Sequence, residues 1–391
     1  MKIIVYAIAK NEERNYEGFL DNVAESDGVF ILDTGSDDKK AAKHAVIMGC
    51  RDVINCPVHW SDAYEENDDL PPGVFDFAAA RNNAYALAFD QFHNPNELTY
   101  YISLDLDERL EKGWCSKLKS LLEDYESEPY TEIDFTMNIT HEANPYTYDA
   151  KRGHLELMCE WVYPVHEVLD HTAEEVDRNK LASGINIVHK PDDNKARDYL
   201  PGLMYGIQTY PYEPRMYHYA GRELMMRGNH LAALKIFQQY ISLGENGIYL
   251  WAAETAIIYN YIAFCYEHIG DYDLVEQFFY KAALEMPHCR EPWLDISDYY
   301  HRKNDMLGAY FYLKKAISLP YTDEYMYTKA EAYGHLPHHQ ASFFAHQLGF
   351  KEASIQHIKD AAGASGSKLT PALVSDYVTL CGELPPQFQK G

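Results

Sequence analysis

Residues 1–200 alternate apolar runs with segments of helical periodicity. Lys2–Ile8 is almost continuously apolar, which is typical of a strand buried on both faces. Further strands are predicted at Val29–Leu32, Asp52–Asn55 and Tyr100–Leu104, and helices at Asn11–Ala24, Lys39–Met48, Phe75–Phe92 and about Lys112–Tyr125. Residues 57–74 contain several prolines and an acidic run, and are predicted to form a surface loop. This alternation predicts an α/β fold with a mostly parallel sheet covered by helices.

A second pattern begins after about Tyr210. Gly270-Asp271 and Asn304-Asp305 mark equivalent turns 34 residues apart, which is the tetratricopeptide period. An earlier unit turns at Gly228-Asn229, with extra residues inserted near Gly244–Tyr249, and a degenerate unit surrounds Gly349. The chain is therefore divided into 1–210, an α/β domain, and 211–391, an all-α tetratricopeptide-like solenoid. An irregular helical domain is the alternative for the second part.

Polar clusters follow three of the predicted strands, at Asn11-Glu12, Asp33–Asp38 and Asp105–Glu108. Ligands of such sheets bind beyond the carboxyl ends of the strands. Asp105 and Asp107 lie two residues apart and share one side of a strand end, so they can share Mg²⁺ or Mn²⁺ and neutralise a diphosphate. An acidic loop that caps the next helix is the alternative.

The other candidates also have structural alternatives. Asp33 can accept hydrogen bonds from a base or ribose, or belong to a helix cap with Ser36 and Asp37. Arg81 can bind a phosphate, or pair with the acidic loop before it. His166 and Glu167 follow an aromatic cluster that would raise the pKa of a general base, unless the histidine is structural. His189 ends an apolar strand, either as a structural residue or as a third metal ligand.

Composition narrows the function. Of 391 residues, 47% are hydrophobic and 14% aromatic, which excludes a mainly disordered chain. The net charge of −26 argues against nucleic acid and anionic membranes as partners. The seven cysteines include no C-x-x-C pair, and no apolar stretch resembles a signal peptide or membrane span. We expect a soluble cytoplasmic protein with free thiols.

Several motifs occur together in order: Ile8–Glu13, Leu32–Asp38, Phe75–Asn83 and Leu104–Arg109, followed by Val165–Glu167 and Ile187–Lys190. In this order they resemble the family-2 glycosyltransferases of the Rossmann-like GT-A fold, in particular the branch with C-terminal tetratricopeptide repeats. The resemblance covers about residues 1–200, and the repeats extend it to about residue 360. It implies a nucleotide-sugar pocket formed by Ala9, Asn11, Glu12, Asp33, Arg81 and Asp105, with Asp33 on the base.

The same resemblance implies that Asp107 binds Mn²⁺ or Mg²⁺ and that His189 completes the metal or diphosphate site. Glu167 is the predicted catalytic base, with His166 and Glu160 as rivals. The expected function is inverting, metal-dependent transfer of a sugar from a nucleotide-diphosphate donor, with a UDP-sugar favoured.

The solenoid groove suits a protein, peptide or glycan acceptor, or a homodimer contact. Two alternatives remain: transfer to a modified base in DNA, and a non-catalytic repeat-scaffold adaptor with a degenerate transferase domain. A nucleotidyltransferase is disfavoured because the segment around Lys10 is not a glycine-rich basic loop.

Overall fold

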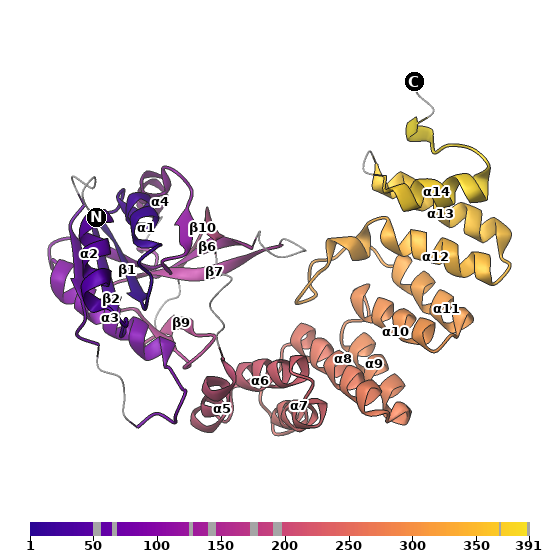
Figure 1. The fold of residues 1–391 in the computed structure, drawn as a ribbon, viewed down its shortest axis with the longest axis horizontal. Helices are drawn as coiled ribbons and strands as arrows, with labels where there is room; N and C mark the ends of the chain where they lie inside the picture. Colours follow the sequence, from indigo (N-terminus) through magenta and orange to yellow (C-terminus); the bar gives the residue numbers. More distant parts are fainter. Residues whose placement is uncertain are drawn as a thin grey trace. The chain divides into compact units, whose positions relative to one another are not determined.

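The computed structural model describes residues 1–49, 56–64, 69–124, 128–139, 146–172, 179–190, 198–366 and 369–388. The chain divides into two compact units, Met1–Pro211 and Tyr212–Gly391. The first contains a mixed sheet with helices, and the second is helical (Figure 1).

The N-terminal unit is built on one sheet whose strands, among the described residues, follow the order β3-β2-β1-β4-β7-β6-β10-β5. β1 pairs in parallel with β2 and β4, and β2 pairs in parallel with β3. A separate β8–β9 ribbon is antiparallel. The strands are β1 (Lys2–Ala9), β2 (Gly28–Asp33), β3 (Val58–Ser61), β4 (Thr99–Ser103), β5 (Glu108–Leu110), β6 (Glu132–Ile139), β7 (Tyr146–Leu155), β8 (Cys159–Val162), β9 (Val168–His171) and β10 (Lys180–His189).

Helices cover both faces of this sheet. Ile3 and Val5 pack in one core with side chains of α1, α2 and α4, whereas Ile4 and Tyr6 pack in another with α3. Because neighbouring strand residues point to opposite faces, an apolar run such as β1 is explained by burial on both sides. The helices of this unit are α1 (Tyr16–Val23), α2 (Lys39–Gly49), α3 (Phe77–Phe92), α4 (Trp114–Glu123) and α5 (Leu200–Thr209).

Three sequence predictions need correction. The sheet is mixed rather than mostly parallel, because β7 runs antiparallel between β4 and β6, and β5 runs antiparallel to β10. The predicted loop 57–74 contains the half-buried strand β3, while the strand expected at Asp52–Asn55 lies outside the described residues. The first helix begins only at Tyr16, with Asn15 as its N-cap, and the left-handed backbone of Asn11, with φ 56°, lies outside it.

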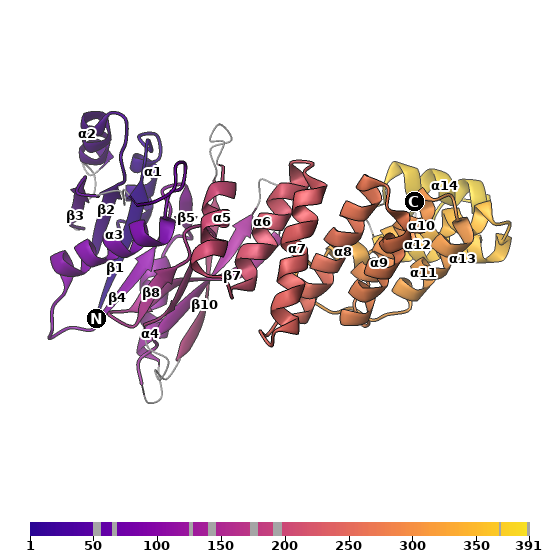
Figure 2. The same cartoon turned by 90° about the horizontal axis from the view of Figure 1, so that it is seen from below.

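The C-terminal unit consists of helices that contact their neighbours in chain order, as both views show (Figures 1 and 2). Gly228, Gly270, Asn304 and Gly349 all have positive φ and occupy the turns inside successive helix pairs. The helices are α6 (Pro214–Met226), α7 (His230–Glu245), α8 (Ala252–Ile269), α9 (Tyr272–Glu285), α10 (Glu291–Arg302), α11 (Met306–Ile317), α12 (Leu336–Gln347), α13 (Lys351–Ser365) and α14 (Pro371–Cys381), with short 3₁₀ turns at Ala330–Tyr333 and Pro386–Phe388.

Two of these pairs share a buried hydrogen bond. The Ser297 hydroxyl donates to the Ala309 carbonyl at 2.8 Å, and the Ser342 hydroxyl donates to the Ser354 carbonyl at 2.9 Å. Donor and acceptor are 12 residues apart in both cases. The α10–α11 and α12–α13 pairs therefore repeat one local structure, as stacked tetratricopeptide-like units require.

None of the helices in the described part of the chain combines the length and apolar character needed to cross a bilayer.

Candidate functional site

The carboxyl ends of β1, β2 and β4 lie side by side in the N-terminal unit. Ala9 is level with Asp33 in the parallel register of β1 and β2, and Tyr6 is level with Ser103 in that of β1 and β4. The Ala9 carbonyl accepts hydrogen bonds from the Thr34 backbone and hydroxyl, at 2.8 and 3.1 Å. The loops that follow these strands therefore begin at one edge of the sheet.

Asp33 ends β2 with only 1% of its surface exposed. Its Oδ1 accepts hydrogen bonds from the backbone N–H groups of Gly35 and Ser36, at 2.9 and 2.8 Å. Its Oδ2 is buried and has no hydrogen-bond partner among the described residues. A buried acceptor of this kind is costly unless a donor reaches it. Asp33 is therefore tied into the turn by one oxygen and offers the other to an N–H or O–H group.

Two buried polar atoms of aromatic side chains belong to the same part of the unit, and they make a hydrogen-bonding contact with each other. They are the Tyr16 hydroxyl of α1 and the Trp60 indole nitrogen of β3. Burial, reinforced by the charge of Asp33, raises the pKa of Tyr16 well above its ordinary value. Tyr16 therefore stays a neutral hydroxyl, able both to donate and to accept a hydrogen bond.

Asn11 and Glu12 are held by local contacts. The Asn11 amide exchanges two hydrogen bonds with Asp37, and the Asn11 backbone N–H donates to the Ser36 hydroxyl at 2.8 Å. Glu12 accepts a hydrogen bond from the Asn15 side chain at 2.7 Å. Asn11 therefore joins the loop after β1 to the loop after β2, whereas this contact of Glu12 serves the start of α1.

Arg81 is the centre of a buried ionic group. Its Nε donates to Glu167 and its Nη2 to Asp105, both at 2.8 Å, while its Nη1 donates to the Ser103 hydroxyl at 3.1 Å. The guanidinium also lies 5.1 Å from the centre of the Trp161 ring. Although burial lowers the pKa of Arg81, the two carboxylates raise it more, so the group is permanently charged.

Local contacts of α3 place Arg81 beside Glu167. Asp76 caps the helix by accepting from the Ala79 N–H at 2.9 Å, and the Phe77 N–H donates to the Pro164 carbonyl at 2.8 Å. The side chain of Asn82 makes two 2.8 Å hydrogen bonds to the backbone of Trp161. The start of α3 therefore fixes the segment that carries the predicted base.

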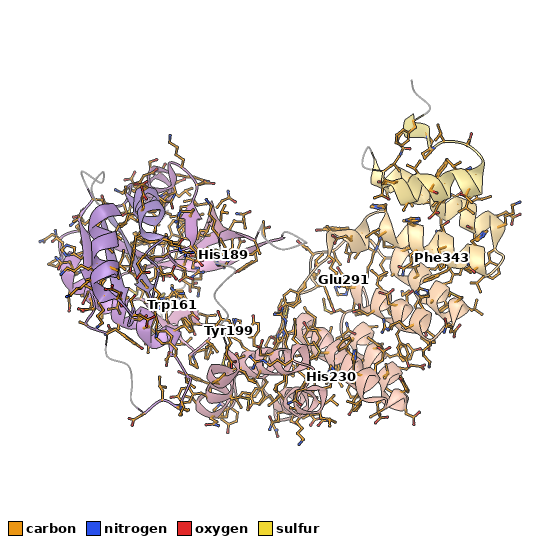
Figure 3. All side chains as sticks on the ribbon, viewed as in Figure 1. Trp161, His189, Tyr199, His230, Glu291 and Phe343 are labelled. Atoms are coloured by element: carbon orange, nitrogen blue, oxygen red, sulfur yellow. The ribbon has the colours of Figure 1, made fainter. Side chains whose placement is uncertain are left out.

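That segment contains unusual backbone. Tyr163 and His166 have φ of 74° and 52°, in the left-handed region that non-glycine residues rarely adopt. Strained positions of this kind are concentrated at functional sites. The centre of the His166 ring lies 5.5 Å from the centre of the Tyr199 ring. Tyr199 and Trp161 of this region are labelled in Figure 3. Glu160, the other rival base, is exposed on β8, between the buried side chains of Cys159 and Trp161.

Glu108 belongs to a second ionic pair, which the sequence did not predict. Its Oε1 lies 2.6 Å from Nη2 of Arg152, and its Oε2 accepts from the Asp105 N–H at 2.9 Å. Burial raises the pKa of Glu108, and neighbouring Asp105 adds to this, in opposition to Arg152. Arg152 lies in β7, a strand whose polar sequence gave no signal of a site residue.

The two predicted metal ligands do lie together. The Asp107 Oδ2 is 3.4 Å from Nε2 of His189, which ends β10. The hydrogen-bonding contact with Asp107 is the main cause that raises the pKa of His189, and burial opposes it. In the described part of the chain, no third histidine, cysteine or carboxylate joins this pair within 4.8 Å. One carboxylate and one imidazole suit an ion that takes its other ligands from phosphate and water.

The comparisons with known proteins do not support the predicted family. No protein-family model matches the chain, and no curated protein matches it. Solved structures of MamA from Desulfovibrio magneticus RS-1 match with 12% identity and a TM-score of 0.33, over 44% of this chain and 86% of that one. PilF of Pseudomonas aeruginosa matches with 11% identity and a TM-score of 0.32, over 43% of this chain and 68% of that one.

The assignment to the family-2 glycosyltransferases and the GT-A fold is therefore wrong on these findings, since no protein-family model and no curated protein of that kind matches the chain. A physical reason lies in the motifs themselves. Asp33 and Asn11 make the hydrogen bonds that ordinary strand-end turns require, so short motifs around them arise without a common family. Function has to be argued from the site.

Proposed function

We propose that the N-terminal unit binds a nucleotide sugar together with Mn²⁺ or Mg²⁺ and transfers the sugar to an acceptor. The proposal rests on the site geometry and not on family membership. The observation that carries it is the 3.4 Å approach of Asp107 to His189 at the edge of the sheet where parallel strands end. Binding of small ligands at this edge is general for such sheets.

Each part of the donor has a complementary group. The free oxygen of Asp33 would accept an N–H of the base, and uracil, which has one N–H on its ring edge, fits a single acceptor. Asp107 and His189 would hold the metal ion, which supplies positive charge to the departing diphosphate. Asp105 would face the ribose or the sugar. Ala9, Asn11 and Glu12 would contribute to the walls of the nucleotide pocket.

Glu167 is the proposed base. It would take the proton from an acceptor hydroxyl as that oxygen forms a bond to the anomeric carbon, and the bond from this carbon to the diphosphate oxygen breaks. Arg81 holds Glu167 through its Nε and holds Asp105 through its Nη2, both at 2.8 Å. Its role would be to fix the distance between base and donor, since its nitrogens are occupied by protein acceptors rather than directed to a phosphate.

The acceptor would be a protein, peptide or glycan that docks on the helical unit. That unit exposes large apolar side chains, among them Tyr249, Phe311 and Leu284. Such side chains favour protein contacts, either with the acceptor or with a second copy of the chain. The described cysteines form no disulfide with one another. A reducing, cytoplasmic location is part of the proposal, since thiols stay reduced there.

A second candidate is a non-catalytic scaffold, in which the helical unit binds partners and the first unit only stabilises it. One observation favours it: Arg81 and Arg152 already neutralise Glu167, Asp105 and Glu108, so these carboxylates have structural partners. A modified base in DNA remains a further acceptor to test, through the salt dependence of acceptor binding.

Nucleotide release from a panel of sugar nucleotides separates the candidates. Wild-type protein would be assayed with Mn²⁺, with Mg²⁺ and with chelator, beside Asp107→Asn and the matched control Asp90→Asn, an exposed residue of α3. The transferase proposal predicts metal-dependent release from one donor that Asp107→Asn abolishes and the control retains. If no donor gives nucleotide release and no donor raises the melting temperature, the transferase proposal is rejected in favour of the scaffold.

A further inference from the structure

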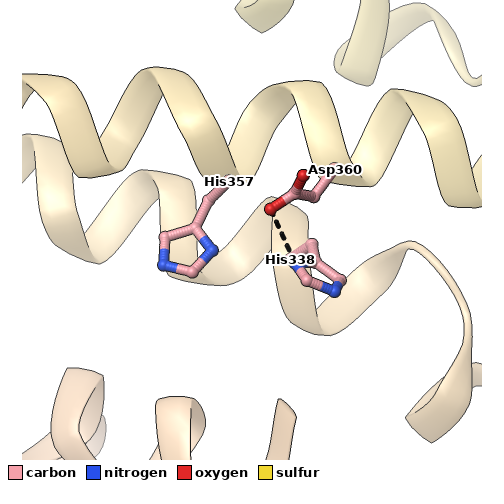
Figure 4. Close-up of side chains that lie close together, drawn as sticks. All are labelled: His338, His357 and Asp360. Atoms are coloured by element: carbon pink, nitrogen blue, oxygen red, sulfur yellow. Dashed lines mark ion pairs between the residues drawn. The ribbon is translucent and has the colours of Figure 1, made fainter. Parts of the chain in front are cut away.

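A cluster of two histidines and one aspartate joins helices α12 and α13 in the helical unit. His357 and Asp360 are three residues apart on α13, so they share one face of that helix. His338 lies in the first turn of α12. Figure 4 shows the three side chains close together, and their ligand atoms all lie within 4.8 Å of one another. Nothing in the proposed transfer reaction uses this cluster.

One nitrogen of each histidine ring points into the cluster without another contact among the described residues. The Nδ1 atoms of His338 and His357 are both buried, and neither has a hydrogen-bond partner in the described part of the chain. The Asp360 Oδ2 lies 3.8 Å from the His338 Nδ1, which is too far for a hydrogen bond. Two buried imidazole nitrogens without partners beside a carboxylate are unusual in a folded protein, where buried polar atoms are generally satisfied.

Neighbouring side chains orient the outer atoms of the same groups. Nε2 of His357 lies 3.1 Å from the Tyr310 hydroxyl of α11. Oδ1 of Asp360 accepts a hydrogen bond from the Gln356 amide at 2.9 Å. Outer contacts of this kind fix the tautomer of a ligating histidine and the direction of a ligating carboxylate. They leave the Nδ1 of His357 and the Oδ2 of Asp360 as the inner atoms.

We propose that His338, His357 and Asp360 bind a divalent transition-metal ion of the zinc class between α12 and α13. Two imidazoles and one carboxylate select Zn²⁺ and its first-row neighbours over Mg²⁺ or Ca²⁺, which prefer oxygen ligands. Tetrahedral ligands at about 2.0–2.1 Å from zinc lie about 3.4 Å apart, so the side chains must approach by about 1.4 Å at most. Rotation of half-buried side chains allows such a movement without shifting the helices.

Asp360 supplies the negative charge of the cluster, beside two basic side chains. Asp360 opposes the positive charges of Arg290 and Lys314, which act on His338 and His357 respectively. Three protein ligands leave the fourth zinc position to water or to a group from a partner. Because the ligands come from two helices, the ion would link α12 to α13 and stabilise the folded pair by mass action.

The test uses the full-length chain, stripped with chelator and titrated with Zn²⁺ and separately with Co²⁺. Calorimetry gives stoichiometry and affinity, and the visible absorption of bound Co²⁺ reports nitrogen and oxygen ligation. The variants are His338→Asn, His357→Gln and Asp360→Asn. The matched control is His346→Gln, an exposed histidine of α12, and Asp107→Asn removes the separate ion of the proposed transferase site.

We expect one Zn²⁺ per chain that survives Asp107→Asn and His346→Gln. Each of the three ligand variants should weaken it on the order of 100-fold or more, and should lose the Co²⁺ absorption. Zn²⁺ should also raise the melting temperature of wild type but not of His357→Gln. The proposal is overturned if Asp360→Asn and a folded histidine variant bind zinc as tightly as wild type. It is also overturned if the control His346→Gln loses as much zinc affinity as the ligand variants do. Asp360→Asn keeps the side-chain shape, so the test survives if a histidine variant does not fold.

Discussion

Replacing Gly221 by alanine should destabilise the helical unit by overfilling one helix contact. Gly221 lies in α6, and a methyl group built there would come within 2.3 Å of Cε1 of Phe237 in α7. Carbon atoms pack best at about 3.5–4.0 Å, so the overlap exceeds about 1 Å. Phe237 is fully buried and its ring centre lies 5.7 Å from that of Tyr261, so a movement of Phe237 disturbs this packing.

The magnitude follows from two opposing effects. Overfilling a packed core costs about 1–3 kcal/mol, whereas glycine to alanine inside a helix gains up to about 1 kcal/mol. We therefore expect Gly221→Ala to lower the free energy of unfolding by up to about 2 kcal/mol. Gly363→Ala in α13 is the matched control, because a methyl group there meets no atom within 4 Å. It should be neutral or stabilising by up to about 1 kcal/mol.

Both variants are compared with wild type by urea and thermal unfolding, followed by circular dichroism. A shift of up to about 4–8 °C downward is expected for Gly221→Ala, from about 2–4 °C for each kcal/mol in a chain region of this size. The double variant Gly221→Ala with Phe237→Leu should recover part of the loss because the smaller side chain makes room. If Gly221→Ala is as stable as wild type, or if Gly363→Ala is equally destabilised, close packing at Gly221 is not what limits this contact.

Three further predictions concern buried polar groups. Burial raises the pKa of Asp295 from 3.8 to about 6, so its ionised form is unfavourable in the folded state. Asp295→Asn should therefore raise the free energy of unfolding by up to about 3 kcal/mol at pH 7.5. Thermal unfolding at a series of pH values should show this gain vanish as the pH falls from about 6 to below 4. Arg81→Ala should lower the free energy of unfolding by about 3–5 kcal/mol because Glu167 and Asp105 both lose their cation. A melting temperature equal to that of wild type would show that these ion pairs are not formed. Trp161→Phe removes the 2.7 Å hydrogen bond to the Tyr6 hydroxyl and should cost about 1–3 kcal/mol in urea unfolding, whereas an unchanged midpoint would argue against that contact.

Sequence patterns predicted the elements whose burial is uniform. β1 and β2 were visible because each is apolar on both faces, and the turns at Gly270 and Asn304 were visible because the repeat requires a left-handed residue. β7 was not predicted, because its sequence is polar and carries neither alternation nor an apolar run. The sequence therefore showed the half of the sheet with parallel neighbours and missed the antiparallel strand that completes it.

The candidate site divides in the same way. Asp107 and His189 were expected together, and they lie 3.4 Å apart. The ionic group around Arg81 was not expected, since Glu167 is 86 residues away along the chain and only tertiary packing brings it close. Charge pairs between distant segments leave no periodic trace, so Arg152 was missed as well. The sequence position of Asp33 at the end of a strand was enough to propose it as a site residue. That only one of its two carboxylate oxygens has a hydrogen-bond partner among the described residues could not be predicted.

The serine hydrogen bonds between paired helices have a consequence for how the helical unit opens. Ser297 and Ser342 each form a buried hydrogen bond between two paired helices, so one helix cannot slide along the other without breaking that bond. Two helices joined by such a hydrogen bond should therefore unfold and refold together as one cooperative unit, rather than one helix at a time. Hydrogen exchange should show one common rate for the amides of α10 and α11, and one common rate for those of α12 and α13. The helical unit would then unfold two helices at a time.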